Sequence, residues 1–265
     1  MHRVQIRRVN TFAERPFSGC PVTVCILDDP RPQEWMQQVA REMRRYKTAF
    51  INRTGSTYHL RCFTPTVEID LSGGGTVAAA HILWETGELR RADDVEFLTR
   101  RGAVRARLNN DLIEVVLKTV DETQIDGVQI ESSLGIDAEY AGVDPSGTCI
   151  VEIDSDQTLK RLRPDVHAVG LMPFRSVVIT SKSSSDEFDI VSRVFSPRIG
   201  VEEDPASATA HACMAPYWSR KLGKNSFSGS QGLERRGIIH VRLDGDQAYL
   251  AGKAFTILDG TLSAS

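Results

Sequence analysis

The two halves of the chain repeat one order of apolar and polar segments. In the first half, an apolar run at residues 22–27 predicts a buried strand, and apolar positions on one helical face predict a helix over residues 32–43. Two apolar segments around a Thr-Gly turn then predict a hairpin at residues 48–52 and 58–63. In the second half, the same series of strand, helix, strand and strand is predicted at residues 149–153, 157–162, 177–181 and 188–195.

A shared motif follows each series. Phe63-Thr64-Pro65 and Phe195-Ser196-Pro197 both precede an acidic stretch, a cluster of small residues and an alanine-rich helix containing a histidine. The first of these helices, expected near residues 76–88, is apolar on nearly all sides, which is typical of a helix inside its domain. Further strands are predicted at residues 95–99, 103–108 and 112–117, and at residues 238–243 and 247–251.

This repetition predicts a duplicated α+β fold. We expect two pseudo-symmetric domains, each a curled and mostly antiparallel sheet around one central buried helix. A polar stretch at residues 118–129 favours a boundary there, with domains at residues 1–118 and 119–265 and an active-site cleft between them. The sequence leaves open whether a strand from the last residues crosses back into the first domain.

Composition narrows the classes of partner. The chain has 265 residues, of which 41% are hydrophobic and 25% charged, as in globular proteins. Its formal net charge of −3 gives no broad basic field for nucleic acid or an anionic membrane. No apolar run reaches the ~18 residues of a membrane span, and the start lacks an apolar signal core, so we expect a cytoplasmic protein. Five scattered cysteines without a CxxC pair indicate free thiols, and His59 and Cys62 lack further ligands at metal spacing, so we expect no metal.

The small-residue turns before the two alanine-rich helices are candidate anion sites. A helix that begins there exposes unpaired N–H groups and the positive end of its dipole. Three glycines would let a carboxylate approach the backbone closely. The alternative, a flexible turn followed by ordinary N-caps, stays open. The residues predicted to bind substrate in this way are Gly73, Gly74, Gly75 and Thr76, and in the second half Ser207, Ala208 and Thr209.

Seven motifs resemble those of the PhzF-like family of phenazine-biosynthesis isomerases, which shares the diaminopimelate epimerase fold. The likeness implies a two-domain, cofactor-independent isomerase, usually a homodimer, that moves a proton along a small carboxylate, often in antibiotic biosynthesis and other secondary metabolism. The motifs span nearly the whole chain in order: residues 15–21, 48–50, Phe63-Thr64-Pro65, residues 70–80, Phe195-Ser196-Pro197, residues 203–206 and residues 229–232.

Some positions depart from the family pattern. The glutamate that serves the family as general acid/base is replaced by Lys47, and the histidine of its Gly-rich turn is replaced by Gly74. The asparagine of its Gly-Asn-Pro motif is replaced by Cys20. Asp204 is retained, and Thr209 keeps a hydroxyl where the family has serine.

Lys47 and Asp204 are the candidate catalytic residues. Lys47 follows Arg41, Arg44 and Arg45, and three roles stay open for it: a base whose pKa is lowered by desolvation, an anchor for a carboxylate, or a solvated cation. Asp204 is a proton-transferring or substrate-orienting carboxylate by the resemblance, and a helix N-cap otherwise.

Several other polar residues are weaker candidates. Cys20 either lines the cleft or is a small buried residue. Asp70 and Glu203 rank after Asp204, and a structural role is expected for His81 and His211. The polar segment at residues 229–232 is expected to be a loop before a strand. By the resemblance this loop lines the cleft or the dimer contact, with Arg235 or Arg236 in reach of a carboxylate, and otherwise it is a turn with a solvated charge cluster.

The resulting hypothesis is a cofactor-independent isomerase that shifts a proton or a double bond in a small unsaturated carboxylate or amino acid. Since serines occupy both helix-end turns, at Ser72 and Ser207, a two-thiol epimerase mechanism is disfavoured. The alternative is a catalytically impaired homologue that binds a small molecule.

Overall fold

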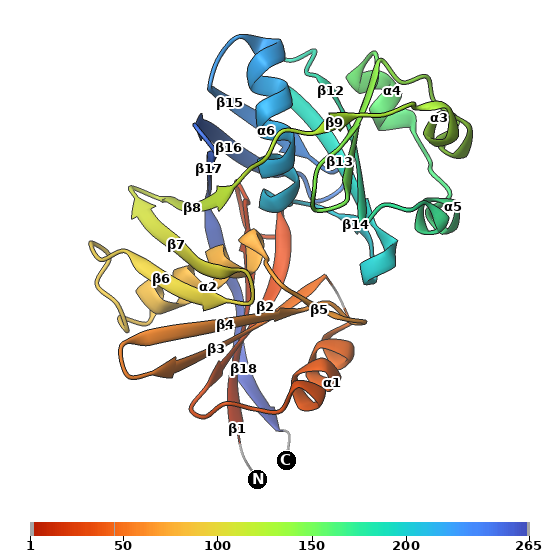
Figure 1. Cartoon of the computed structure of the whole chain (residues 1–265). Coiled ribbons are helices and arrows are strands. Elements are labelled where there is room, and N and C mark those ends of the chain that lie inside the picture. The colour runs from red at the N-terminus through yellow and green to blue at the C-terminus, as the bar shows by residue number, and fades with distance from the viewer. Residues whose placement is uncertain (1–2, 45, 264–265) are drawn as a thin grey trace. The chain divides into compact units, whose positions relative to one another are not determined.

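The computed structural model describes residues 3–44 and 46–263, except the side chains of Val128 and Gln129, so Arg45 of the basic run before Lys47 lies outside the described residues. The chain divides into two compact units (Figure 1). Unit 1 comprises Met1–Val116 and Ala251–Ser265, and unit 2 comprises Leu117–Leu250. The last residues therefore belong to unit 1, whereas the sequence-based division assigned them to the second domain.

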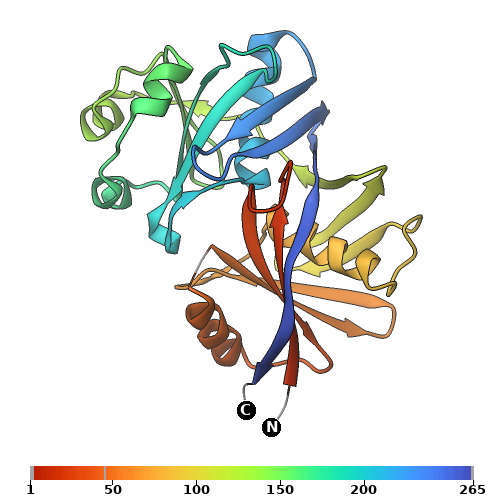
Figure 2. The ribbon, with the colours of Figure 1, turned by 180° about the vertical axis from the view of Figure 1, so that it is seen from behind.

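The reason for this difference is strand β18 (Ala254–Ser263). It pairs antiparallel with β1 (Arg3–Thr11) along its length, from Arg3 opposite Ser263 to Thr11 opposite Ala254. Figure 2 shows the blue β18 beside the red β1. The chain therefore does return to its first domain with a last strand, which the sequence left open.

In unit 1, the sheet continues from β1 through β2 (Cys20–Leu27), β3 (Lys47–Thr54), β4 (Thr57–Phe63), β6 (Val95–Thr99), β7 (Gly102–Asn109) and β8 (Leu112–Lys118), the last ending beyond the unit boundary. The two-residue β5 (Glu68–Ile69) pairs with the end of β4. Helix α1 (Gln33–Met43) lies between β2 and β3 in sequence and buries Met36, Val39 and Ala40 against Phe50 and Phe63.

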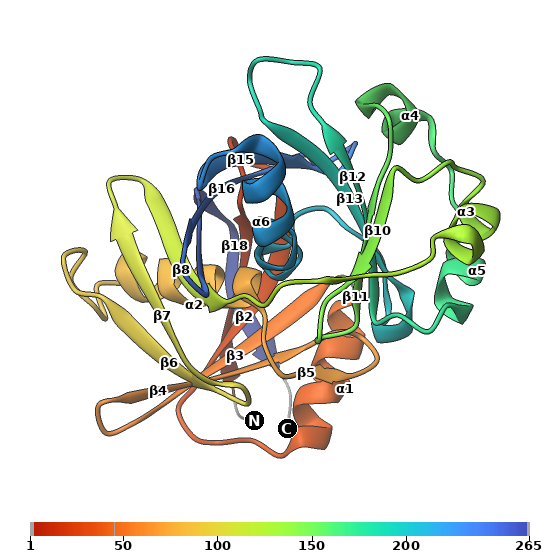
Figure 3. The ribbon, with the colours of Figure 1, turned by 45° about the horizontal axis from the view of Figure 1, so that its top comes forward.

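In unit 2, the strands are β9 (Thr123–Gln124), β10 (Tyr140–Val143), β11 (Thr148–Glu152), β12 (Ser176–Lys182), β13 (Ile190–Ser196), β14 (Val201–Asp204), β15 (Ser226–Gln231), β16 (Gly237–Asp244) and β17 (Gln247–Gly252), whose last two residues belong to unit 1. The helices are α3 (Val128–Leu134), α4 (Asp156–Arg161), α5 (Val166–Leu171), the 3₁₀ helix η1 (Pro197–Ile199) and α6 (Ala208–Leu222). Helix α6 packs against β15 and β16 (Figure 3).

The strand pairings repeat between the units. β2–β3 and β11–β12 are parallel, β3–β4 and β12–β13 are antiparallel, and β4–β6 and β13–β15 are again parallel. Each unit also carries one alanine-rich helix with a mostly buried surface, α2 (Gly73–Glu85) in unit 1 and α6 in unit 2. The predicted α+β class, with two pseudo-symmetric units around buried helices, is confirmed.

A duplicated ion pair accompanies this symmetry. Arg61 of β4 donates to both oxygens of Glu68, with two N–O distances of 2.7 Å, and its guanidinium lies 5.4 Å from the Phe63 ring centroid. Arg193 of β13 pairs with Glu203 in the same bidentate way, at 2.9 and 2.8 Å. The sequence contains these charges, but their pairing depends on the register of two short strands.

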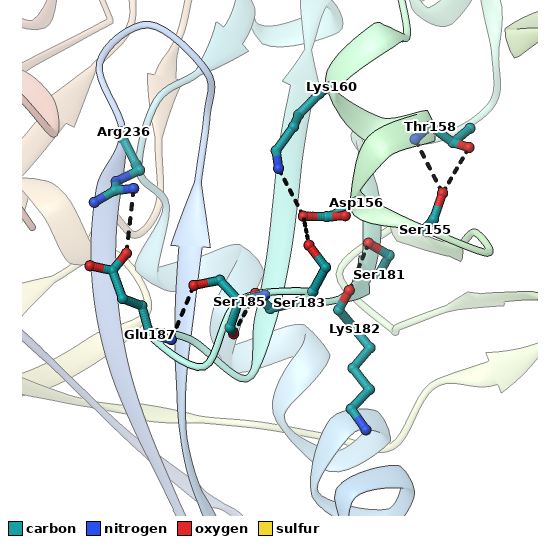
Figure 4. A network of polar contacts seen from close by, with 11 residues as sticks. Ser155, Asp156, Thr158, Lys160, Ser181, Lys182, Ser183, Ser185, Glu187 and Arg236 are labelled. Carbon is teal, nitrogen blue, oxygen red and sulfur yellow. Dashed lines mark hydrogen bonds and ion pairs between the residues drawn. The ribbon is translucent and has the colours of Figure 1, made fainter.

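The serine-rich segment between β12 and β13 is a loop, as expected, and it is tied to α4. Asp156 accepts hydrogen bonds from Lys160 and from Ser184, both at 2.8 Å. Figure 4 shows Lys160 pointing toward Asp156, and Arg236 pointing toward Glu187. The Arg236–Glu187 distance is 3.9 Å, so this candidate arginine already faces a carboxylate of its own unit.

Candidate active site

The start of α2 differs from the expected Gly-rich turn. The helix begins at Gly73, three residues earlier than predicted, so the three glycines form its first turn. Ser72 is the N-cap, and its hydroxyl accepts the N–H of Gly75 at 2.9 Å. The N–H groups of Gly73 and Gly74 have no intrahelical acceptor, by the geometry of an α-helix. They are the donors that a bound anion would use.

Packing explains one of these glycines and leaves another unexplained. A Cβ on Gly75 would lie 2.5 Å from the sulfur of Cys62, so only glycine fits beside that thiol. A Cβ on Gly74 would lie 3.4 Å from Thr11 Oγ1 and 3.9 Å from a Val22 methyl, which are ordinary contacts. Gly74 therefore keeps a bare backbone where the fold itself would accept a side chain.

Lys47 lies on the same sheet face as the start of α2. It pairs with Val22 across the parallel β2–β3 ladder, and neighbours in a ladder share a face. Val22 faces Gly74, as the short Cβ distance shows. Lys47 is 7% exposed, so it is not the solvated cation that the sequence leaves open as one of its roles.

The Cys62 thiol links Lys47 to the helix end. Burial raises the pKa of Cys62 to about 12, whereas the charge of Lys47 and a hydrogen bond with Ser72 act in the opposite direction. Cys62 is thus a neutral thiol at physiological pH, within reach of both Lys47 and the N-cap. The sequence predicts a free thiol at Cys62 that binds no metal, but no local pattern points from it to Lys47 or Ser72.

Cys20 begins β2 and is fully buried. It pairs with Thr11, whose hydroxyl donates to the Cys20 carbonyl at 3.2 Å. Since Thr11 faces Gly74, Cys20 belongs to the same side of the sheet. The structure of unit 1 therefore brings Lys47, Cys20 and the first turn of α2 to one face, and adds Thr11 and Cys62 to the predicted set.

The start of α6 in unit 2 repeats this geometry. Its N-cap Ser207 has φ −132° and ψ 104°, close to φ −139° and ψ 108° at Ser72. The Ser207 hydroxyl accepts the N–H of Ala210 at 3.3 Å and lies 3.0 Å from the hydroxyl of Thr209. Ala208 and Thr209 are the first two helical residues, so they match Gly73 and Gly74.

The two threonines of the small-residue turns, Thr76 and Thr209, are therefore not equivalent, because they are the fourth and the second residue after their N-caps. Thr76 and His211 are each the fourth residue after the N-cap. Thr76 Oγ1 donates to the Ser72 carbonyl at 2.9 Å, and His211 Nδ1 lies 3.0 Å from the Ser207 carbonyl. The side-chain pattern around each N-cap is what the two halves share, and the sequence spacing alone did not reveal it.

Asp204 ends β14 and is 4% exposed. One of its carboxylate oxygens accepts the N–H of Ala206 at 3.3 Å. Gln231 of β15 holds the same turn: its amide nitrogen donates to the Asp204 carbonyl, and its amide oxygen accepts the N–H of Ser207 at 3.0 Å. Residues 229–231 therefore belong to a strand and not to the predicted loop, because they pair with both β13 and β16.

His211 is fully buried beside this turn. Burial lowers its pKa to about 4, and the hydrogen bond to Ser207 and the charge of Asp204 only partly oppose that shift. The ring is therefore neutral at pH 7, and since a carbonyl accepts from Nδ1, the proton is assigned to that nitrogen. Nε2 has no hydrogen-bond partner among the described residues and lies where a Cβ on Gly229 would approach it to 2.5 Å.

The remaining candidates have structural partners. Glu203 is held by Arg193, and Asp70 lies 3.2 Å from Arg100. His81 Nε2 lies 3.1 Å from the Thr256 hydroxyl of β18, which itself donates to Glu85.

Comparison with known proteins assigns the family. The family model of phenazine biosynthesis-like proteins, PhzC-PhzF, matches residues 9–260. The chain belongs to this family. An uncharacterized isomerase of Halalkalibacterium halodurans is 38% identical to this PhzF-like chain over 256 residues, which cover 96% of each.

Solved structures agree with the PhzF-like assignment. A phenazine biosynthesis protein of the PhzF family from Enterococcus faecalis has a TM-score of 0.91 at 26% identity, covering 99% of this chain and all of its own. A predicted epimerase from Pseudomonas aeruginosa has a TM-score of 0.79 at 19% identity, covering 99% of this chain and all of its own, which shows a shared fold. The protein is therefore a PhzF-like isomerase with an epimerase-type fold.

No described helix is long and apolar enough to cross a membrane. Among the same residues, no group of three or more His, Cys, Asp or Glu side chains is arranged to hold a metal ion. The polar groups near the start of α2 are backbone N–H groups, hydroxyls, thiols and the Lys47 cation, and those near the start of α6 are backbone N–H groups, hydroxyls and the Asp204 carboxylate.

Proposed function

We propose that this PhzF-like isomerase shifts a proton, or a double bond, in a small unsaturated carboxylate or amino acid without a cofactor. The observation that supports this most directly is the repetition of one helix-end geometry with a buried charged side chain beside each copy. Lys47 lies on the sheet face that carries the start of α2, and Asp204 ends the strand just before α6. Burying either charge is costly, so its retention favours a chemical role.

The start of α2 supplies what an acid group needs. Two backbone N–H donors at bare glycines, the helix dipole and the Lys47 cation all favour a negative charge at one place. As negative charge develops when a proton leaves carbon, such fixed donors stabilise it without reorganisation. Lys47 then acts either as the anchor of the acid group or, when neutral, as a base.

The start of α6 supplies a second acid–base group. Asp204 is held at the end of β14 by the Ala206 N–H, which donates to its carboxylate, and by the Gln231 side-chain amide, which donates to its carbonyl, so its carboxylate is pre-positioned to accept or deliver a proton. The hydroxyl of Thr209 is close by in sequence and orients a substrate group. Cys20, which shares a sheet face with Lys47, is proposed to line the substrate site.

Solvent-deuterium exchange tests the assignment. The protein is incubated in D₂O with a panel of β,γ-unsaturated amino acids and cyclohexene carboxylates, and label uptake at carbon is followed by NMR. We expect Lys47→Ala and Asp204→Asn each to slow uptake by about 10²-fold or more. The matched controls are Lys182→Ala and Asp186→Asn, which change exposed residues of unit 2.

The kinetic split separates the two roles of Lys47. Loss of an anchor raises KM with little change in kcat, whereas loss of a base lowers kcat. Uptake at wild-type rates in both Lys47→Ala and Asp204→Asn would refute the catalytic assignment.

The replacement of the family's Glu and His by Lys47 and Gly74 favours a second candidate function, a small-molecule-binding protein. It predicts that a panel compound binds, as shown by shifts in its NMR signals, but gains no label under any condition. A role in natural-product biosynthesis and a homodimeric state are further proposals from the family resemblance. Light scattering after size-exclusion chromatography measures the latter directly.

A further inference from the structure

We propose that Gln231 is a positioning residue that holds the turn between β14 and α6, and with it the carboxyl group of Asp204, in the geometry required for proton transfer. This inference rests on the proposed function of Asp204. It concerns a residue that does not itself touch the reacting atoms.

The Gln231 amide spans the turn. Its nitrogen donates to the carbonyl of Asp204, the last residue of β14, and its oxygen accepts the N–H of Ser207, the N-cap of α6. One planar group therefore bonds to the backbone on both sides of Pro205 and Ala206. The side chain is fully buried, so water does not compete for these two bonds.

The backbone that carries this amide is itself fixed. Gln231 pairs with Ser192 of β13 on one side and with Gly237 of β16 on the other. Gly232 donates its N–H to the Ser192 carbonyl at 3.0 Å and has φ +78°. A Cβ on Gly232 would lie 3.2 Å from the Pro205 carbonyl oxygen, so the glycine lets this strand end lie directly against the turn.

The turn needs this support because its own backbone can form few hydrogen bonds. Proline has no N–H, so Pro205 cannot donate to a ladder. The β13–β14 pairing is also irregular between Val194 and Ser196, where β14 meets the end of β13. An amide, which combines one acceptor and a donor at the right separation, replaces the missing ladder bonds.

The equivalent strand of the other half carries a different side chain at this position. The register of β4 with β6 matches that of β13 with β15, and it places Thr99 at the position equivalent to Gln231. The Thr99 hydroxyl donates to the Gly102 carbonyl at 2.7 Å, within its own hairpin. The pair of hydrogen bonds from the Gln231 amide, here called the clamp, is therefore found in the half that carries the buried Asp204. If the clamp served only the architecture of the fold, both halves would need it.

Two substitutions test the proposal. Gln231→Met has similar length and volume but no hydrogen-bonding amide, and Gln231→Glu keeps the shape. Gln157→Met, on the exposed side of α4, is the matched control. Each variant is measured for deuterium uptake into the panel compounds, for melting temperature and for hydrogen exchange at the Ser207 amide.

For Gln231→Met we expect faster exchange at the Ser207 amide and a kcat for deuterium uptake lowered by about 10- to 100-fold, with KM nearly unchanged, because a misplaced catalytic group costs rate. Rates are compared well below the melting temperature of the variant. A purely structural residue would lower the melting temperature and leave kcat of the folded protein unchanged, which would overturn the proposal.

Gln231→Glu adds a readout that folding alone does not move. A protonated carboxyl has the same donor and acceptor pattern as the amide, whereas an ionised one cannot donate to the Asp204 carbonyl. The nearby titratable groups are Asp204 of β14 and His211 of α6, and Arg193 of β13 is already bonded to Glu203. We expect the kcat of Gln231→Glu to be near wild type at low pH and to fall as the introduced carboxyl group ionises. A pH profile of kcat parallel to that of wild type would contradict the clamp.

Failure of the proposed function is distinguishable from failure of the clamp. If wild type exchanges no deuterium into any panel compound, the isomerase proposal fails and the catalytic part of this inference fails with it. The amide measurement still decides whether Gln231 holds the turn. Unchanged protection of Ser207 in Gln231→Met would overturn that part independently.

Discussion

At the scale of single residues, His211 makes stability depend on pH. It is neutral and fully buried when the protein is folded, with a pKa of about 4 against an ordinary value of 6.5. Between these two pH values the unfolded chain binds the additional proton, so the free energy of unfolding falls as the pH drops from 6.5 towards 4. The loss over that window is about 3 kcal/mol for this group.

His211→Gln tests this prediction, because glutamine keeps an N–H donor near the Ser207 carbonyl but does not titrate. Urea unfolding at about pH 7 and about pH 4.5 gives the free-energy change for each protein. We expect wild type to lose about 2 kcal/mol more than His211→Gln on acidification. Equal losses would show that His211 is not the residue responsible.

The residue scale also shows where sequence reasoning stops. Lys47 and Asp204 are candidates because a family resemblance points to their positions in short motifs. The resemblance also includes Gln231 in a motif but does not show what it contacts, and no pattern singles out Cys62 or Thr11, because each of the three acts across strands that are distant in sequence. Gln231 bonds to the turn at residues 204–207 from another strand, and no local pattern marks such a contact.

At the scale of elements, the first turn of α2 offers a matched pair of glycines. Gly74→Ala places a Cβ in ordinary contact with Thr11 and replaces a poor helix former, so it should raise the free energy of unfolding by up to about 1 kcal/mol. Gly75→Ala forces a Cβ against the Cys62 sulfur, so it should lower that free energy by about 1 to 3 kcal/mol.

Urea denaturation of the two variants measures these changes, and the double variant Gly75→Ala/Cys62→Ala identifies the cause. Removing the sulfur should make the added methyl group less costly than it is in the wild-type background. If Gly74→Ala and Gly75→Ala were equally harmful, the first turn would be limited by helix geometry and not by these side-chain contacts.

Most elements were predictable because each carries its own periodic signal. The hairpin around Thr54 and Gly55 and helix α1 lie within a few residues of the predicted ranges. The start of α2 was placed three residues late, because glycine is a poor helix former and three in a row suggest a turn. Ser72 overrides that preference by capping the helix, and the buried packing of α2 stabilises the rest.

At the scale of the whole chain, duplication accounts for both repeated strand orders, but not for β18. This strand has no strong apolar run, and its partner β1 lies at the opposite end of the sequence. Periodicity detects elements and is silent about which strands pair, so the sequence left the crossover open. Since β1 lies between β2 and β18, the last residues complete the sheet of unit 1.

Deletion of residues 254–265 should therefore weaken unit 1 alone. Without β18, β1 becomes an edge strand, the Arg7–Asp259 ion pair is lost, and Leu262 no longer packs against the cluster around Val4. Hydrogen exchange resolved by peptide should show lower protection across residues 3–63 and wild-type protection across residues 148–231. A synthetic peptide of residues 251–265 should restore protection to β1, because it supplies the missing ladder. Uniform loss over both units would mean that they do not fold as separate cooperative units, and unchanged protection of β1 would mean that β18 contributes little to the stability of its sheet.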